Sequence, residues 1–135
     1  MSGALVAAVG ASGDIHSITI SNRSVEHTVF DPSDATASYS LENDGDIVVT
    51  TDGDIGDWIG PKDSFSDYEC QMATVSGTVT TGTVDSYLGL GTTRTWTKAR
   101  TTIGISEFVG TLTIRRVVDS VVLGTATITL TATVE

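Results

Sequence analysis

The sequence predicts an all-β fold, namely an antiparallel, immunoglobulin-like β-sandwich of about 9–10 short strands with almost no helix. First, residues 110–134, read GTLTIRRVVDSVVLGTATITLTATV, alternate apolar and polar side chains over most of their length. A period of two places successive side chains on opposite faces of a strand. Second, the chain is rich in Thr, Val and Ile, which suit a pleated surface, and in Ser and Gly. Third, turn signals recur at a spacing of roughly 8–12 residues.

Residues 110–134 are expected to form a half-buried β-hairpin arm. In its first half, Leu112 and Ile114 alternate with threonines and an arginine. A tight turn is expected near Asp119-Ser120, and Gly124 is expected to break the return strand. The inward positions of the second half are Ala126, Ile128, Leu130, Ala132 and Val134. Its outward positions are Thr125, Thr127, Thr129, Thr131 and Thr133.

The length of 135 residues favours a single sandwich domain, expected over residues 14–135. Residues 1–13 are small and Gly-rich, and they are expected to form an N-terminal arm. This arm is either loosely held or adds a strand to a neighbouring subunit through its apolar run at Leu5, Val6 and Val9. The run is short and no basic region precedes it, so neither a signal peptide nor a membrane anchor is expected.

Turn signals divide the first half of the chain into short strands. Four strands are expected there: Ile15 to Ile20, Val25 to Phe30, Ala37 to Leu41 and Asp46 to Thr50. The first two are expected to flank a turn at residues 21–24, and the last two flank the hairpin signal Asn43-Asp44-Gly45. Residues 55–61 are expected to be a loop anchored by Trp58.

In the second half, Tyr68 to Val75 is expected to be a central strand with Tyr68, Cys70 and Met72 facing the core. The strands Ser86 to Leu90 and Arg94 to Arg100 are expected to follow as a pair whose large core residue is Trp96. Residues 101–107 are expected to be a connection, in which Ile103 and Ile105 could form a short strand.

The net charge of −10 and pI of about 4.3 argue against binding to nucleic acid or to anionic membranes. Most of the positive charge lies in the C-terminal half, at Arg94, Lys98, Arg100, Arg115 and Arg116, whereas the negative charge is concentrated before residue 70. Two interpretations stay open. The two halves could pair internally, or the asymmetry could make complementary ends on neighbouring subunits.

Aspartates and histidines offer only weak metal-binding candidates. The aspartates Asp44, Asp46, Asp52, Asp54 and Asp57 lie close together among glycines, and calcium prefers such oxygen ligands. The terminal glutamate and flanking helices of an EF-hand are lacking, and hairpin turns use the same residues. His16 and His27 have no third ligand nearby, so surface histidines are expected rather than a zinc site.

No sequence pattern points to catalysis. There is no G-x-S-x-G nucleophile elbow and no glycine loop leading into a helix. Cys70 is the only cysteine, which excludes an intrachain disulfide, and its inward position predicts an inert thiol. We therefore expect no enzymatic activity, no cofactor and no small-molecule substrate.

The order of several short motifs resembles a known group of proteins. They are Tyr39-Ser40-Leu41, Asn43-Asp44-Gly45-Asp46, Gly56-Asp57-Trp58-Ile59, Tyr68-Glu69, residues 88–97 (LGLGTTRTWT), residues 110–116 (GTLTIRR) and residues 126–132 (ATITLTA). Over roughly residues 36–134 the chain resembles small all-β structural proteins of tailed bacteriophages and prophages, usually labelled virion structural or tail-associated proteins. Lys98 departs from the pattern, which has an apolar or neutral residue there. The resemblance carries no catalytic residues.

The resemblance implies a non-enzymatic, tail-associated component of a phage virion, made in the host cytoplasm. It would bind other virion proteins, in multiple symmetric copies, through its surface and strand edges. The candidate assembly surface is Leu5, Val6, Val9, Thr125, Thr127, Thr129 and Thr131. Two alternatives are a capsid decoration protein and a host-surface or carbohydrate-binding module with Trp58 or Trp96 as a sugar platform.

Overall fold

The computed structural model describes residues 15–41, 47–51, 55–57, 68–90 and 93–135. Every regular element within these residues is a β-strand and none is a helix, which confirms the all-β prediction. The strands are β2 (Ile15–Ile20), β3 (Arg23–Val29), β4 (Ala35–Leu41), β5 (Ile47–Thr51), β6 (Ile55–Asp57), β7 (Tyr68–Ser76), β8 (Leu88–Gly89), β9 (Arg94–Arg100), β10 (Gly104–Arg116) and β11 (Val122–Val134).

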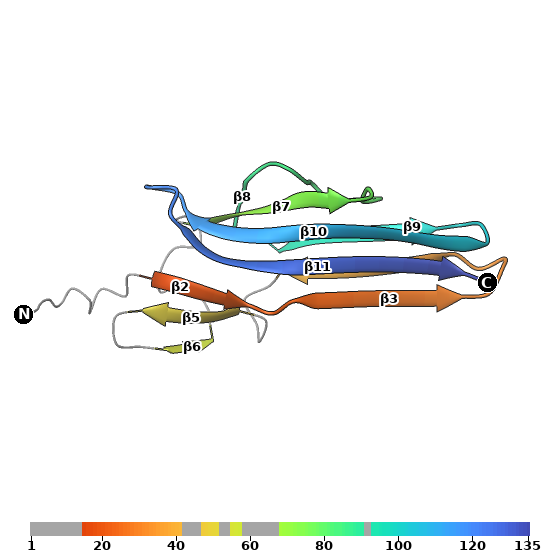
Figure 1. Cartoon of the computed structure of the whole chain (residues 1–135), viewed down its shortest axis with the longest axis horizontal. Coiled ribbons are helices and arrows are strands. Elements are labelled where there is room, and N and C mark those ends of the chain that lie inside the picture. Colours follow the sequence, from red (N-terminus) through yellow and green to blue (C-terminus); the bar gives the residue numbers. More distant parts are fainter. Residues whose placement is uncertain (1–14, 42–46, 52–54, 58–67, 91–92) are drawn as a thin grey trace, which may run out of the picture.

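The largest sheet is built on the hairpin of β10 and β11, each 13 residues long. The strand order is β3-β11-β10-β7-β8 (Figure 1). The β10–β11 pairing is antiparallel and sets Leu112 opposite Ala126, so the apolar residues of both strands share one face. Strand β3, however, pairs with β11 in parallel. The expectation of a wholly antiparallel fold is therefore wrong, and this sheet is mixed.

A second layer is formed by the antiparallel pair β4 and β9, which contacts the inward face of the large sheet over β10 and β11. In this pair Tyr39 lies opposite Trp96, and the two rings stack with their centroids 6.1 Å apart. A third, small sheet has the order β2-β5-β6 and lies at the end of the molecule where the β10–β11 hairpin turns (Figure 1).

Two predicted hairpins are wrong because their strands pair with distant partners. Strands β2 and β3 run in the same direction, separated only by Ser21-Asn22, so residues 21–24 do not reverse the chain (Figure 1). The Asn22 Oδ1 accepts a hydrogen bond from Thr127 N–H at 2.8 Å, which fixes the crossing from one sheet to the other. Likewise β4 pairs with β9, whereas β5 pairs with β2 and β6. The residues of the Asn43-Asp44-Gly45 signal lie outside the described part of the chain.

Three further local predictions need correction. The segment predicted as a loop at residues 55–61 begins with strand β6, while Trp58 lies outside the described residues. The connection predicted at residues 101–107 ends at Gly104, where β10 begins. The strands predicted at residues 86–90 and 94–100 do not pair, because β8 pairs with β7 and β9 with β4.

Gly124 does not break β11, which continues through it. Instead the register between β10 and β11 shifts there, so that Ile114 lies opposite Gly124 and Arg115 opposite Val122. The extra residue of this β-bulge, Leu123, is buried, and Val122 is turned outward.

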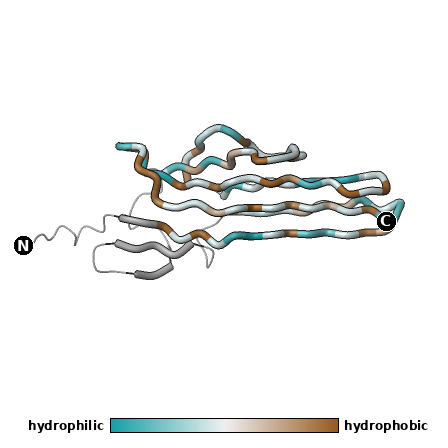
Figure 2. The backbone as a smooth tube through the Cα atoms, viewed as in Figure 1, coloured by the Kyte–Doolittle hydropathy of each residue, from teal (hydrophilic) through white to brown (hydrophobic). Residues whose placement is uncertain are grey.

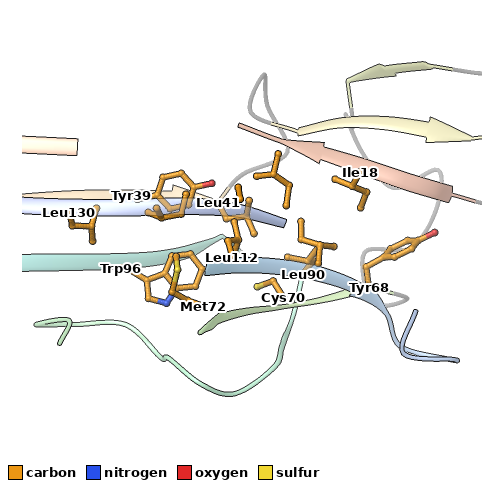
Figure 3. Close-up of a cluster of buried hydrophobic side chains, with 14 of the residues drawn as sticks. Ile18, Tyr39, Leu41, Tyr68, Cys70, Met72, Leu90, Trp96, Leu112 and Leu130 are labelled. Carbon is orange, nitrogen blue, oxygen red and sulfur yellow. The ribbon is translucent and has the colours of Figure 1, made fainter. Parts of the chain in front are cut away.

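The core fills the space between the large sheet and the β4–β9 pair (Figure 3). Tyr68, Cys70 and Met72 of β7 point into it, as predicted, and Trp96 is its largest buried side chain. Among residues with described side chains, no polar or charged residue is buried in it. Each large apolar side chain that is fully buried contributes about 1.5–3 kcal/mol. The central members are Tyr39, Leu41, Met72, Trp96, Phe108, Leu112, Ile114, Ile128 and Leu130.

Gly124 is required where β2 crosses β11. A Cβ atom at this position would lie 1.9 Å from the carbonyl oxygen of Ile18, a backbone atom that cannot move without displacing β2. We expect Gly124→Ala to lower the free energy of unfolding by about 1–3 kcal/mol. Urea denaturation followed by circular dichroism measures this change.

Gly89→Ala is the matched control, because a Cβ atom there would meet no atom within 4 Å. Its free energy of unfolding should stay within about 0.5 kcal/mol of the wild type. Equal effects of the two substitutions would contradict the close approach of β2 to Gly124.

Candidate functional site

The outward threonines predicted as an assembly surface form a sheet face and not a sheet edge. Strand β11 lies between β3 and β10, and it pairs with β10 along most of its length and with β3 over Ile128 to Val134. Thr125 and Thr127 are exposed, while Thr129 and Thr131 are half-buried between the neighbouring strands. Any partner of these side chains would have to lie flat on the sheet. Leu5, Val6 and Val9 lie outside the described residues.

Arg115 lies on the outward face of the large sheet and contacts two neighbouring side chains. Its Nε lies 2.6 Å from Glu69 Oε2 on the neighbouring strand β7, and its guanidinium carbon lies 3.5 Å from the centre of the Tyr87 ring. Both members of the ion pair are partly shielded from water. The pair links the acidic first half of the chain to the basic second half, which supports the internal-pairing interpretation of the charge asymmetry.

Lys98 and Arg100 of β9 donate mainly to backbone carbonyl groups. Lys98 Nζ lies 2.6 Å from Thr78 O, which gives this side chain a structural role in holding the segment after β7. Arg100 donates through Nε to Thr102 O and through a terminal nitrogen to Ile103 O, each at 2.8 Å. These bonds fix the turn between β9 and β10. Neither side chain is arranged to bind an anion.

Trp96 cannot serve as a sugar platform, because its side chain is only 1% exposed. Its Nε1 donates a 2.6 Å hydrogen bond to Thr83 O, and one face of its ring stacks on Tyr39. The carbohydrate-binding alternative therefore loses one of its two candidates. The other, Trp58, lies outside the described residues.

The calcium candidates Asp44, Asp46, Asp52 and Asp54 also lie outside the part of the chain that the structure describes. Within that part, no group of three or more His, Cys, Asp or Glu side chains is placed to hold a metal ion.

The two histidines lie on different sheets. His27 is exposed on β3, and its Nδ1 accepts a 2.9 Å hydrogen bond from Thr36 N–H. This bond connects the edges of the two layers. His16 lies in β2, and nothing further is described of its side chain.

Cys70 is completely buried in the core between the layers. Burial raises the pKa of its thiol from 9.0 to about 11, because desolvation disfavours the thiolate more than the nearby Arg94 charge favours it. A neutral thiol is a poor nucleophile, and the core offers no access to a substrate. The side chain fills space.

The most unusual surface feature is the apolar residues at the two ends of the β10–β11 hairpin, brown in Figure 2. At the hairpin turn, four valines are exposed: Val117, Val118, Val121 and Val122. At the opposite end, Phe30, Ile103 and Ile105 are exposed. The alternation of the strands does not predict that these side chains are exposed. The signal was present in VVDSVV, where apolar residues flank the turn without alternating with polar ones.

Searches of protein-family models, of curated proteins and of solved structures found no match to this chain. Across the described residues there is no helix with the length and hydrophobicity needed to cross a membrane.

The burial of Cys70 predicts protection of its thiol and a specific alkaline instability. At pH 8 the folded protein should react with a disulfide reagent far more slowly than the urea-unfolded protein. Between pH 9 and 11 the unfolded thiol loses its proton while the folded thiol keeps it. The free energy of unfolding should therefore fall by about 1.4 kcal/mol per pH unit on account of this group.

Cys70→Ala isolates the thiol from the tyrosines and lysines that also ionise at alkaline pH. Its stability should decline less steeply than that of the wild type over this interval, although its stability at pH 7 is lower because the core loses a sulfur atom. Parallel alkaline slopes, or rapid labelling of the native thiol, would contradict this environment for Cys70.

Proposed function

We propose that this protein is a non-enzymatic structural component of a tailed-phage virion, associated with the tail and bound to other virion proteins. The observation that carries the proposal is the exposure of apolar side chains at both ends of the domain. Such patches mark protein-protein contacts in soluble proteins. The described core contributes packing alone, and the charged side chains considered above are engaged in structural contacts. We name a tailed-phage virion as the assembly because the sequence resembles small phage structural proteins.

We also infer that the two-layer arrangement is an immunoglobulin-like sandwich. In that fold three consecutive strands of one sheet are C, F and G, and strands B and E pair in the other. Strands β7, β10 and β11 occupy the C, F and G positions, and β4 and β9 occupy those of B and E. The turn between β10 and β11 then corresponds to a loop that related sandwiches use for binding, which supports a contact at the valines.

Localisation in intact particles tests the proposed function. An antibody raised against the purified domain, applied with gold label to particles from a host that carries the gene, should mark the tail in electron micrographs. Particles from a deletion of the gene are the matched control and should carry no label.

Label confined to the head would replace the tail assignment with the capsid-decoration alternative. Purified particles that contain none of this chain by mass spectrometry would refute a virion role in either position.

A further inference from the structure

We propose that the domain self-associates head to tail, with the valine tip of one copy docked on the acidic end of the next. The valine tip is Val117, Val118, Val121 and Val122. The acidic end is Phe30, Ile103 and Ile105 together with the carboxylates of Asp31, Asp34 and Glu135. This inference goes beyond the proposed function, since self-association of the purified chain does not depend on a place in a virion.

The valine tip is a defined structure. Arg116 Nε lies 3.2 Å from Asp119 Oδ1, and Asp119 Oδ1 accepts a hydrogen bond from Val121 N–H at 3.1 Å. Two backbone bonds close the turn, from Arg116 N–H to Val121 O and from Ser120 N–H to Arg116 O, both at 2.9 Å. The valine side chains are thus held outward, and that of Val118 is 85% exposed.

The acidic end is equally well fixed. Asp31 N–H donates to Glu135 O at 2.8 Å, and Glu135 N–H donates to Val29 O at 2.9 Å. Beneath it lies a small apolar cluster of Ala35, Ala132 and Val134. The hydrogen bonds of Arg100 hold the turn that carries Ile103. Phe30 and Ile105 are 73% and 69% exposed, so a rigid base presents these apolar side chains to water.

The charges of the two ends disfavour contact between two acidic ends. The acidic end carries three carboxylates, Asp31, Asp34 and Glu135, against the one guanidinium of Arg100, a net charge of −2 (−3 + 1). At the valine tip the opposite charges of Arg116 and Asp119 balance. Two acidic ends would repel each other, whereas a neutral apolar tip meets no such repulsion.

The geometry requires two copies for each contact. Strand β10 has 13 residues, which at roughly 3.3 Å per residue separate the two ends by about 40 Å. One chain therefore cannot bring its own ends together. A contact between different patches of identical subunits is heterologous, so it propagates as a filament or closes as a ring.

Sedimentation velocity with the full chain and two point variants tests this inference. Val118→Asp places a carboxylate on the valine tip, and Ile105→Asp adds one to the acidic end. The wild type should form a concentration-dependent series extending beyond the dimer. Each variant alone should sediment as a monomer. An equimolar mixture of the two should form dimers and nothing larger. The Val118→Asp variant keeps an intact acidic end and the Ile105→Asp variant keeps an intact valine tip, so each mixed pair can form only one contact.

Val75→Asp is the matched control, since Val75 is a similarly exposed valine on β7, away from both ends, and this variant should assemble as the wild type does. Unchanged circular dichroism and melting temperature confirm that each variant is folded, as expected for exposed positions. A wild type that stays monomeric up to millimolar concentration would overturn the proposal. Dimers formed by Ile105→Asp alone would also overturn it, by showing that two valine tips pair with each other.

Discussion

The register between β10 and β11 is the constraint on which the rest of the structure depends. It sets Leu112 opposite Ala126 and Ile114 opposite Gly124, so that both strands present one apolar face. A slip of one residue would turn that face to water, and the layer of β4 and β9 would have nothing to pack on. The pairing of β10 with β7 places Arg115 beside Glu69, and the parallel partner β3 lies along the other side of β11.

The sequence predicted the faces of the strands and the hairpin of β10 and β11, but not the partners of most other strands. The alternation in β7 and β11 was sufficient to place Cys70, Met72 and Leu130 in the core, because burial depends on local pattern. Pairing depends on contacts between distant residues, and for this reason β2 and β3 resembled a hairpin although they belong to different sheets. The hydrogen bond from Thr127 N–H to the Asn22 side chain joins residues 105 positions apart, and no local pattern encodes it.

The candidate site was the harder part to predict, for a related physical reason. The exposed valines at the hairpin turn interrupt the alternation of apolar and polar residues along the strands. Periodicity alone therefore does not identify them as an exposed apolar group. Phe30 directly follows β3 and Ile105 lies in β10, far away in the sequence, and the pairing of both strands with β11 brings the two residues to one end of the sheet. By contrast, the threonines of β11 were conspicuous in the sequence and form an ordinary polar sheet face.

The edges of the large sheet favour contacts at its ends. One edge strand, β8, has only two residues, and the other, β3, carries Arg23, Glu26 and His27, which are polar side chains of the kind that discourage strand addition. The hydrogen bond from Thr36 N–H to His27 also occupies a backbone donor at the gap between the layers. Strand addition at these edges is therefore disfavoured. The valine tip and the acidic end are the surfaces where burial of exposed apolar side chains against a partner would be most stabilising.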